Sequence, residues 1–175
     1  MENKKYGIRR PVPLAVILLI LLGLRIAYVR GDIGMPEKAM YEQELEELQE
    51  ERPLYGAIGD SMAVFLDYRE DLTDIDVDIY VKRKYNIGWF FRYGQSGDGP
   101  QDYLQKMNCD GNGEYVLLYL SADPVSHIEV DKGNGTTMTI NPEQGKPFAR
   151  VMKRSWNVVV YDEDGGIIRP VERNM

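Results

Sequence analysis

A serine and a histidine are the residues of this chain whose types could together perform covalent chemistry. Ser61 follows Gly59 and Asp60 in a short polar segment, and His127 is the only histidine. A serine hydroxyl becomes a useful nucleophile when a histidine accepts its proton and a carboxylate orients that histidine. The nearest acidic residue before the histidine is Asp123. The candidate catalytic set is therefore Ser61, His127 and Asp123.

The segment Ile58-Gly59-Asp60-Ser61-Met62 resembles the first sequence block of the GDS-type (SGNH) esterases. In that family the serine of the block is the nucleophile, and a late Asp-x-x-His supplies the base and its carboxylate. Here the spacing is Asp-x-x-x-His, and residues 62–68 have the pattern of a strand where the family has a helix. An envelope esterase using Ser61 and His127 is thus an alternative. We favour Ser61 as a turn residue between two strands and do not predict an enzyme.

An acidic cluster in residues 71–78 is the candidate for a metal site; it consists of Asp71, Asp74, Asp76 and Asp78. A calcium-binding EF-hand loop needs glycine at its sixth position and glutamate at its twelfth. Counted from Asp74, these positions hold Ile79 and Tyr85. On a strand, Asp76 and Asp78 share one face and fit a solvated surface. We therefore predict no metal site and no cofactor, and whether calcium binds stays open.

An aromatic run is the best candidate for a binding surface. Trp89, Phe91 and Tyr93 are spaced to lie on one face of a strand, with Phe90 and Arg92 on the other. Exposed, these rings would form a platform for a glycan or a peptide. Buried, they would form part of the core of the domain. The candidate partner-binding residues are Trp89, Phe90, Phe91 and Tyr93.

Alternating hydrophobicity predicts that residues 54–175 form a β-rich domain. Ile75, Val77, Ile79 and Val81 alternate with polar or aromatic residues, as in a half-buried strand. Glycine-rich and polar turns separate further predicted strands at 62–68, 88–93, 114–120, 127–131, 136–140, 148–152 and 157–161. Because no helical pattern lies between them, we expect either two packed antiparallel sheets or a partly open barrel. Residues 116–120 are apolar on both faces, which indicates a central strand.

Residues 157–168 predict a strand, an Asp-Gly turn and a returning strand, and this pattern resembles the last hairpin of bacterial Ig-like extracytoplasmic domains. Residues 88–94 are similar to segments of uncharacterised membrane-anchored proteins of Gram-positive bacteria. The resemblance implies an Ig-like antiparallel β-sandwich and no activity.

A hydrophobic run near the N-terminus predicts a transmembrane helix over residues 12–29. Every residue from 12 to 24 is apolar, proline or glycine, and ten of those thirteen are Val, Ile or Leu. Their summed insertion free energy is roughly −3 to −6 kcal/mol. Extended to residue 29, with Arg25 as the one charge, the helix would be about 27 Å long, enough for a bilayer core.

An uncleaved signal-anchor is the interpretation we favour for this helix, over a cleaved signal peptide or a buried soluble helix. Residues 24–30 lack the small-x-small pattern of a signal-peptidase site, and no cysteine directly follows the apolar run. A basic cytoplasmic tail at 1–11 would then leave the C-terminal domain on the outer face of the cell membrane.

Residues 30–53 predict an acidic helical stalk. Seven glutamates fall in residues 37–52, between Pro36 and Pro53. Tyr41, Leu45 and Leu48 form a narrow apolar stripe, too short to establish a coiled coil. We favour a spacer whose stripe packs on the domain or on lipid headgroups over a dimer-forming helix.

Charge is distributed unevenly between the tail and the rest of the chain. Residues 1–30 contain six basic residues and one acidic residue, a net charge of +5, which leaves −12 on residues 31–175. So acidic a domain repels phosphate backbones, so we predict no nucleic-acid partner. Cys109 is the only cysteine, which excludes an internal disulfide and a multi-cysteine zinc site. We expect a non-enzymatic extracytoplasmic binding module, or alternatively a structural accessory subunit of a membrane complex.

Overall fold

The computed structural model describes residues 12–29, 44, 52, 54–82, 89–97, 101 and 103–175. They fall into two compact units, Met1–Ile33 and Gly34–Met175. The predicted tail at 1–11 and almost all of the predicted stalk at 30–53 lie outside the described residues.

The described part of the first unit is one helix, α1 (Val12–Val29), with the bounds that the hydrophobic run predicted. From Leu14 to Ile26 its side chains are exposed, and Leu14 and Leu19 are 68% and 67% exposed. Among the described residues, no helix combines the length and the apolar character needed to cross a membrane.

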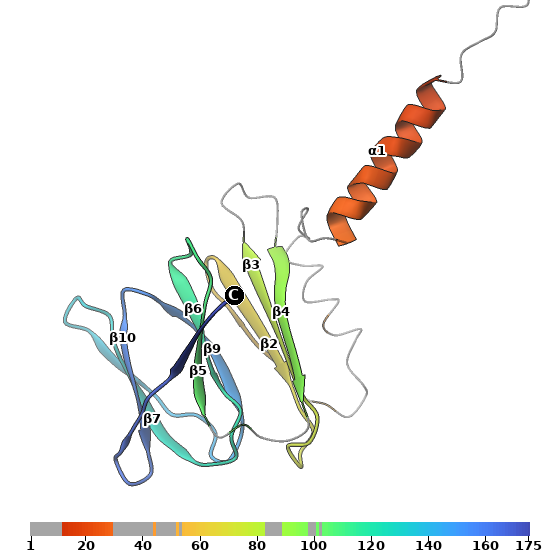
Figure 1. The fold of residues 1–175 in the computed structure, drawn as a ribbon. Helices are drawn as coiled ribbons and strands as arrows, with labels where there is room; N and C mark the ends of the chain where they lie inside the picture. The colour runs from red at the N-terminus through yellow and green to blue at the C-terminus, as the bar shows by residue number, and fades with distance from the viewer. Residues whose placement is uncertain are drawn as a thin grey trace, which may run out of the picture. The chain divides into compact units, whose positions relative to one another are not determined.

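The second unit consists of three four-stranded sheets (Figure 1). Sheet A is an antiparallel meander of β1 (Leu54–Ile58), β2 (Met62–Asp67), β3 (Ile75–Lys82) and β4 (Trp89–Gly97). Sheet B has the order β12 (Val171–Asn174), β5 (Leu104–Asn108), β6 (Glu114–Tyr119) and β9 (Phe148–Lys153). Sheet C has the order β11 (Ile167–Ile168), β10 (Asn157–Asp162), β7 (Val125–Asp131) and β8 (Thr137–Ile140). All pairings are antiparallel except that of β12 with β5.

Sheet B is the middle layer, because both of its faces are packed. Its strand β6 is buried at every residue and lies between β5 and β9. Val116 and Leu118 pack in a core shared with sheet A, while Leu117 and Tyr119 pack in a second core shared with sheet C. The predicted central strand is confirmed, and its uninterrupted apolar pattern follows from burial on two sides.

Sheet A confirms the alternation predicted for residues 75–82. Ile75, Val77, Ile79 and Val81 point into the core shared with sheet B. A separate buried cluster lies on the opposite face of the sheet. It consists of Ala63, Phe65, Tyr80 and Trp89. Tyr80 donates a hydrogen bond to Glu44, a residue of the predicted stalk that is itself buried. The apolar stripe of Tyr41, Leu45 and Leu48, which was predicted to pack on the domain or on lipid headgroups, lies outside the described residues.

The mainly antiparallel β fold is confirmed, but the number of sheets differs from the prediction of two. The predicted strands are all present, and the hairpin at 157–168 pairs Val160 with Ile168 around a turn in which Gly165 has φ of +79°. Strands β5 and β12 were not predicted, whereas β1 is the strand expected before the turn at Ser61, for which no bounds were predicted. Strands β5 and β12 enlarge sheet B, so that it separates A from C as a layer of its own.

Candidate functional site

The predicted aromatic platform is not a surface at its first two residues. Trp89 is 2% exposed and Phe90 is 1% exposed, so both are buried. Trp89 packs on the outer cluster of sheet A, whereas Tyr93 packs against the core shared with sheet B. The side chain of Phe91 lies outside the described residues. The prediction that Trp89 and Phe90 belong to an exposed aromatic binding surface is therefore wrong.

A β-bulge explains why Trp89 and Tyr93 do not share a face. Ile79 pairs with Tyr93 and Tyr80 pairs with Phe91, which leaves Arg92 as an extra residue in β4. An extra residue shifts the alternation by one, so side chains on either side of the bulge point to opposite faces. The simple period of two in the sequence misses this shift.

Ser61 does not contact His127, as a serine esterase would require. The Ser61 hydroxyl donates to Glu114 Oε2 at 3.0 Å. His127 lies on sheet C, where its ring stacks on Tyr161 with centroids 4.6 Å apart and its Nδ1 lies 3.1 Å from the Ser126 hydroxyl. Within the described part of the chain, Ser61 and His127 share no hydrogen bond. The catalytic contact of the esterase alternative is therefore not formed.

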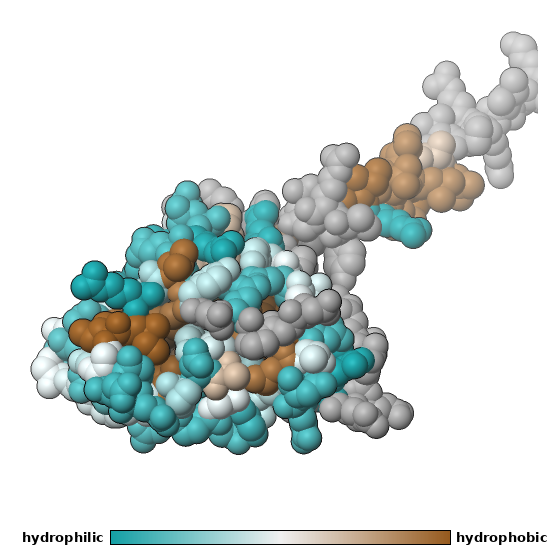
Figure 2. Space-filling view, turned by 60° about the horizontal axis from the view of Figure 1, so that its bottom comes forward, coloured by the Kyte–Doolittle hydropathy of each residue, from teal (hydrophilic) through white to brown (hydrophobic). Residues whose placement is uncertain are grey.

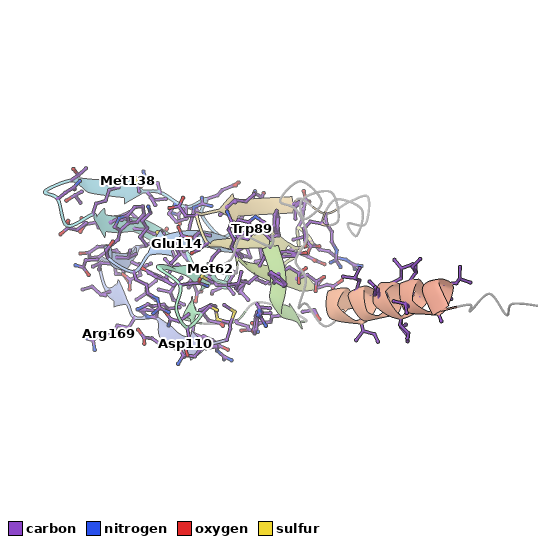
Figure 3. The ribbon with its side chains drawn as sticks, turned by 90° about the horizontal axis from the view of Figure 1, so that it is seen from above. Met62, Trp89, Asp110, Glu114, Met138 and Arg169 are labelled. Atoms are coloured by element: carbon purple, nitrogen blue, oxygen red, sulfur yellow. The ribbon has the colours of Figure 1, made fainter. Side chains whose placement is uncertain are left out.

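Glu114 instead gives the Gly-Asp-Ser segment a structural role (Figure 3). Its carboxylate is 4% exposed and accepts hydrogen bonds from the amides of Asp60, Ser61 and Met62 at 3.0, 2.7 and 3.1 Å. A β-carbon on Gly59 would lie 2.6 Å from Val151 Cγ1, so the segment approaches sheet B closely because this residue is glycine. The carboxylate joins the β1–β2 turn of sheet A to the first residue of β6.

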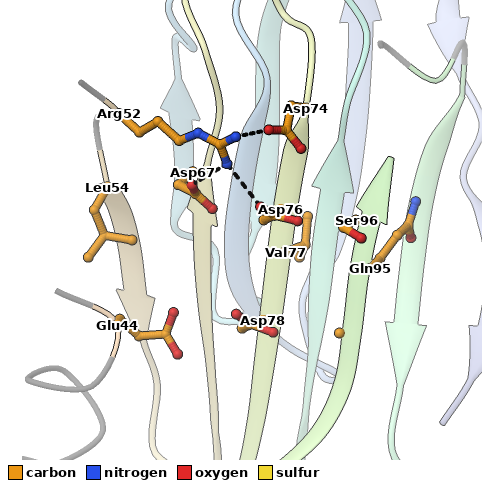
Figure 4. Close-up of a pocket in the computed structure, with 11 residues that line it drawn as sticks. Glu44, Arg52, Leu54, Asp67, Asp74, Asp76, Val77, Asp78, Gln95 and Ser96 are labelled. Atoms are coloured by element: carbon orange, nitrogen blue, oxygen red, sulfur yellow. Dashed lines mark hydrogen bonds and ion pairs between the residues drawn. The ribbon is translucent and has the colours of Figure 1, made fainter. Parts of the chain in front are cut away.

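A polar hollow lies on the outer face of sheet A, and we call it the acidic cleft (Figure 4). Its volume is about 570 Å³. Its charged lining residues are Glu44, Arg52, Asp67, Asp74, Asp76 and Asp78, and Leu54, Val77, Gly94, Gln95 and Ser96 complete the described lining. The pairing of strands places these residues: Asp76 pairs with Asp67 and Ser96, and Asp78 pairs with Gly94. Because Gly94 has no side chain, the sheet is hollow beside Asp78.

Arg52 is held at one end of the cleft by three carboxylates. Its Nη1 lies 3.1 Å from Asp67 Oδ2 and 3.0 Å from Asp76 Oδ2, and its Nη2 donates to Asp74. The Arg52 side chain is 7% exposed, while those of Asp74 and Asp76 are 39% and 36% exposed. The guanidinium is thus buried beneath carboxylates that are open to solvent.

The electrostatics of the cleft favour a cation. The described lining residues include five carboxylates and one guanidinium. Burial raises the pKa of Asp67, the hydrogen bond from Arg52 opposes that rise, and the neighbouring Asp76 carboxylate adds to it. Burial of the carboxylate is the largest cause of this raised pKa, and the charge of Asp76 is a smaller one. Across the described residues, no group of three or more His, Cys, Asp or Glu side chains is arranged to hold a metal ion.

Comparisons with protein-family models, with curated proteins and with solved structures found no match to this chain.

Two of the important residues had roles that the sequence did not reveal. Arg52 was placed at the end of the stalk, and Glu114 appeared as the polar start of an apolar strand. Asp76 and Asp78 were predicted to share the outer face of a strand, and the structure confirms this. The sequence does show Arg52 next to acidic residues, which is a weak sign of an ion pair. Its actual partners Asp67 and Asp76 are 15 and 24 positions away, and only the fold brings them together with Arg52.

Proposed function

We propose that this chain is a non-enzymatic binding module, anchored in the cell membrane by residues 12–29, whose acidic cleft receives a basic segment of a partner on the outer face. The observation that carries the proposal is the cleft itself, in which five carboxylates and one guanidinium are found among the described lining residues. A lysine or arginine side chain would pair with Asp76 and Asp78 on the floor of the cleft.

The face of the β domain shown in Figure 2 supports the same choice of partner. On the face shown in Figure 2, the β domain is mostly hydrophilic with small apolar patches. A partner would therefore be recognised through charge rather than through a large apolar interface, which gives specificity and fast association. The net charge of −12 on residues 31–175 attracts a basic partner to the domain.

Two features support the anchor. The residues of α1 from Leu14 to Leu24 are apolar, and their side chains are exposed. A helix that is apolar on all sides belongs in the core of a protein or in a bilayer.

The Ig-like classification also remains a proposal, and it is supported by the β10–β11 hairpin alone.

Hexalysine is expected to bind the full chain in neutral detergent micelles, and replacement of Asp78 in the cleft is expected to weaken it. The Asp78→Asn variant loses one carboxylate and should bind hexalysine about five-fold more weakly, equivalent to about 1 kcal/mol. The matched control is Asp164→Asn, which removes the same charge from an exposed turn of sheet C. Isothermal titration calorimetry at low and high salt measures both.

The control separates recognition by the cleft from general attraction to an acidic protein. Asp164→Asn should change the affinity less than two-fold. Equal losses in the two variants, or no loss in either, would show that the cleft is not the binding site.

Affinity for hexalysine is also expected to fall as the solution is acidified. The raised pKa of Asp67 means that this carboxylate is protonated at a higher pH than an ordinary aspartate. Binding should weaken as pH falls through that raised value, and Asp67→Asn should remove this part of the profile. Stability changes in the opposite direction: folding favours protonated Asp67, so this contribution is present at low pH and lost as pH rises through the raised pKa. If hexalysine binding depends on pH in the same way in the wild type and in Asp67→Asn, protonation of Asp67 is not the cause of the weaker binding at low pH.

A further inference from the structure

We propose that a pit between sheets B and C binds a small organic acid, namely one aromatic ring or short alkyl chain bearing a carboxylate. The residues that line the pit are Leu104, Tyr115, Leu117, Trp156, Val158, Val160, Ile168 and Pro170, with Lys106, Arg154 and Asn157. This site is independent of the acidic cleft, which lies on sheet A.

Apolar side chains from both sheets line the pit, together with polar ones. Leu104 and Leu117 of sheet B are 0% and 2% exposed, and Val160 of sheet C is 2% exposed. All three belong to the core shared by the two sheets, so the pit is a place where this core remains open. Its volume is about 150 Å³. A cavity of this size has room for one benzene ring.

Tyr115 supplies a hydrogen-bond donor within the pit. The residue is 4% exposed, and its hydroxyl makes no hydrogen bond to any described residue. The hydroxyl oxygen is open to solvent, so the hydroxyl is available to donate a hydrogen bond to an acceptor on a ligand. Burial raises the pKa of Tyr115 to about 12, so the hydroxyl keeps its proton at neutral pH. It can therefore donate to a carboxylate.

Two cations lie at the mouth of the pit. Lys106 and Arg154 also line an adjoining polar hollow of about 330 Å³, so the pit and this hollow share them. Lys106 pairs with Glu172 at 2.9 Å. Arg154 donates one side-chain hydrogen bond, to the carbonyl of Cys109 at 2.9 Å, and its charge contributes to the lowered pKa of the Glu172 carboxylate. Its guanidinium has five N–H donors, and several remain for an anionic ligand.

The pit and its mouth together define the ligand class. The apolar side chains in the pit favour a ring or a short chain, and the Tyr115 hydroxyl and Arg154 guanidinium both favour an acceptor that carries negative charge. A neutral alcohol would fill the pit without using the charge of Arg154, and an amine would be repelled by it. Phenylacetate has the required ring and carboxylate and is the probe for the test.

Trp156 reports on the pit because it lines it. The chain has two tryptophans, so a Trp89→Phe background leaves Trp156 as the only one. We expect phenylacetate to change the emission of the full chain in neutral detergent micelles, with a dissociation constant of about 1 mM. Tyr115→Phe, which removes only the hydroxyl, and Arg154→Gln should each weaken binding about five-fold or more. Arg69→Gln on sheet A is the matched charge control and should leave binding unchanged.

Two further comparisons define the outcomes, with thermal melting to confirm that each variant folds. Ile168→Phe should fill the pit and abolish the emission change, and 2-phenylethanol should bind at least five-fold more weakly than phenylacetate. The proposal is overturned by the absence of a saturable change at about 10 mM phenylacetate, or by equal binding of the acid and the alcohol. Unchanged binding in folded Ile168→Phe would also overturn it, because the ligand would then lie elsewhere. If Ile168→Phe fails to fold, the affinities of the exposed Arg154→Gln variant and of Arg69→Gln for phenylacetate are compared instead. Equal affinities in these two variants would overturn the proposal.

Discussion

Replacing Glu114 with alanine is expected to lower the free energy of unfolding by about 3–5 kcal/mol. The buried carboxylate accepts hydrogen bonds from three consecutive backbone amides and from the hydroxyl of Ser61. Alanine removes all these acceptors and leaves the amides of a packed turn without partners. Urea unfolding of the full chain in neutral detergent, followed by tryptophan fluorescence, measures the change.

Two controls define the role of Glu114. Glu114→Gln keeps one acceptor oxygen and should lose less stability than Glu114→Ala. Glu163→Ala removes a glutamate from an exposed turn and should change stability by less than about 0.5 kcal/mol. A loss in Glu114→Ala no larger than that of Glu163→Ala would contradict the role of Glu114 in joining sheets A and B.

The second large effect is expected at the hydrophobic helix. The full chain should remain in the membrane pellet after alkaline carbonate extraction, and deletion of residues 12–29 should move it to the supernatant. The paired substitution Leu18→Arg with Leu21→Arg should do the same, because each arginine near the centre of a bilayer costs about 2.5–3.5 kcal/mol. Those costs together offset the roughly −3 to −6 kcal/mol expected from the apolar residues.

A matched pair of conservative substitutions completes this experiment. Leu18→Val with Leu21→Val keeps both positions apolar and should stay in the pellet. If the deleted chain also stays in the pellet, another part of the chain holds it there, and the anchor is wrong.

The sequence predicted well those features that depend on local periodicity. The alternation of Ile75, Val77, Ile79 and Val81 located β3 and its buried face, and the doubly apolar residues 116–120 located the central strand. In each case the pattern records which faces of one strand are covered. The Asp-Gly turn at 164–165 similarly located the final hairpin, because a glycine with positive φ fits such a turn.

Features that depend on distant parts of the chain were not predictable in the same way. Strand β5 has the sequence LQKMN and β12 has VERN, and neither alternates clearly. They form strands because β12 pairs with β5, and β5 in turn pairs with β6. The bulge at Arg92 depends on pairing with β3, and the ion pairs of Arg52 depend on the fold of sheet A. Periodicity carries no information about such contacts.

The two candidate sites illustrate the same division. Asp76 and Asp78 could be assigned to one face of a strand from their spacing, so two of the five described carboxylates of the acidic cleft were predictable from the sequence. The pit between sheets B and C was not, because its walls come from strands that are far apart in the sequence and from a third sheet that was not expected.

The most direct test of the account is the side of the membrane on which the β domain lies. In a Cys109→Ser background, Asp164→Cys places the only cysteine on the exposed turn between β10 and β11. Intact bacterial cells expressing this variant are treated with a membrane-impermeant maleimide, and labelling is compared with that of lysed cells. We predict full labelling of the membrane-associated protein in intact cells. Labelling only after lysis would place the domain in the cytoplasm and contradict an outward-facing, membrane-anchored binding module.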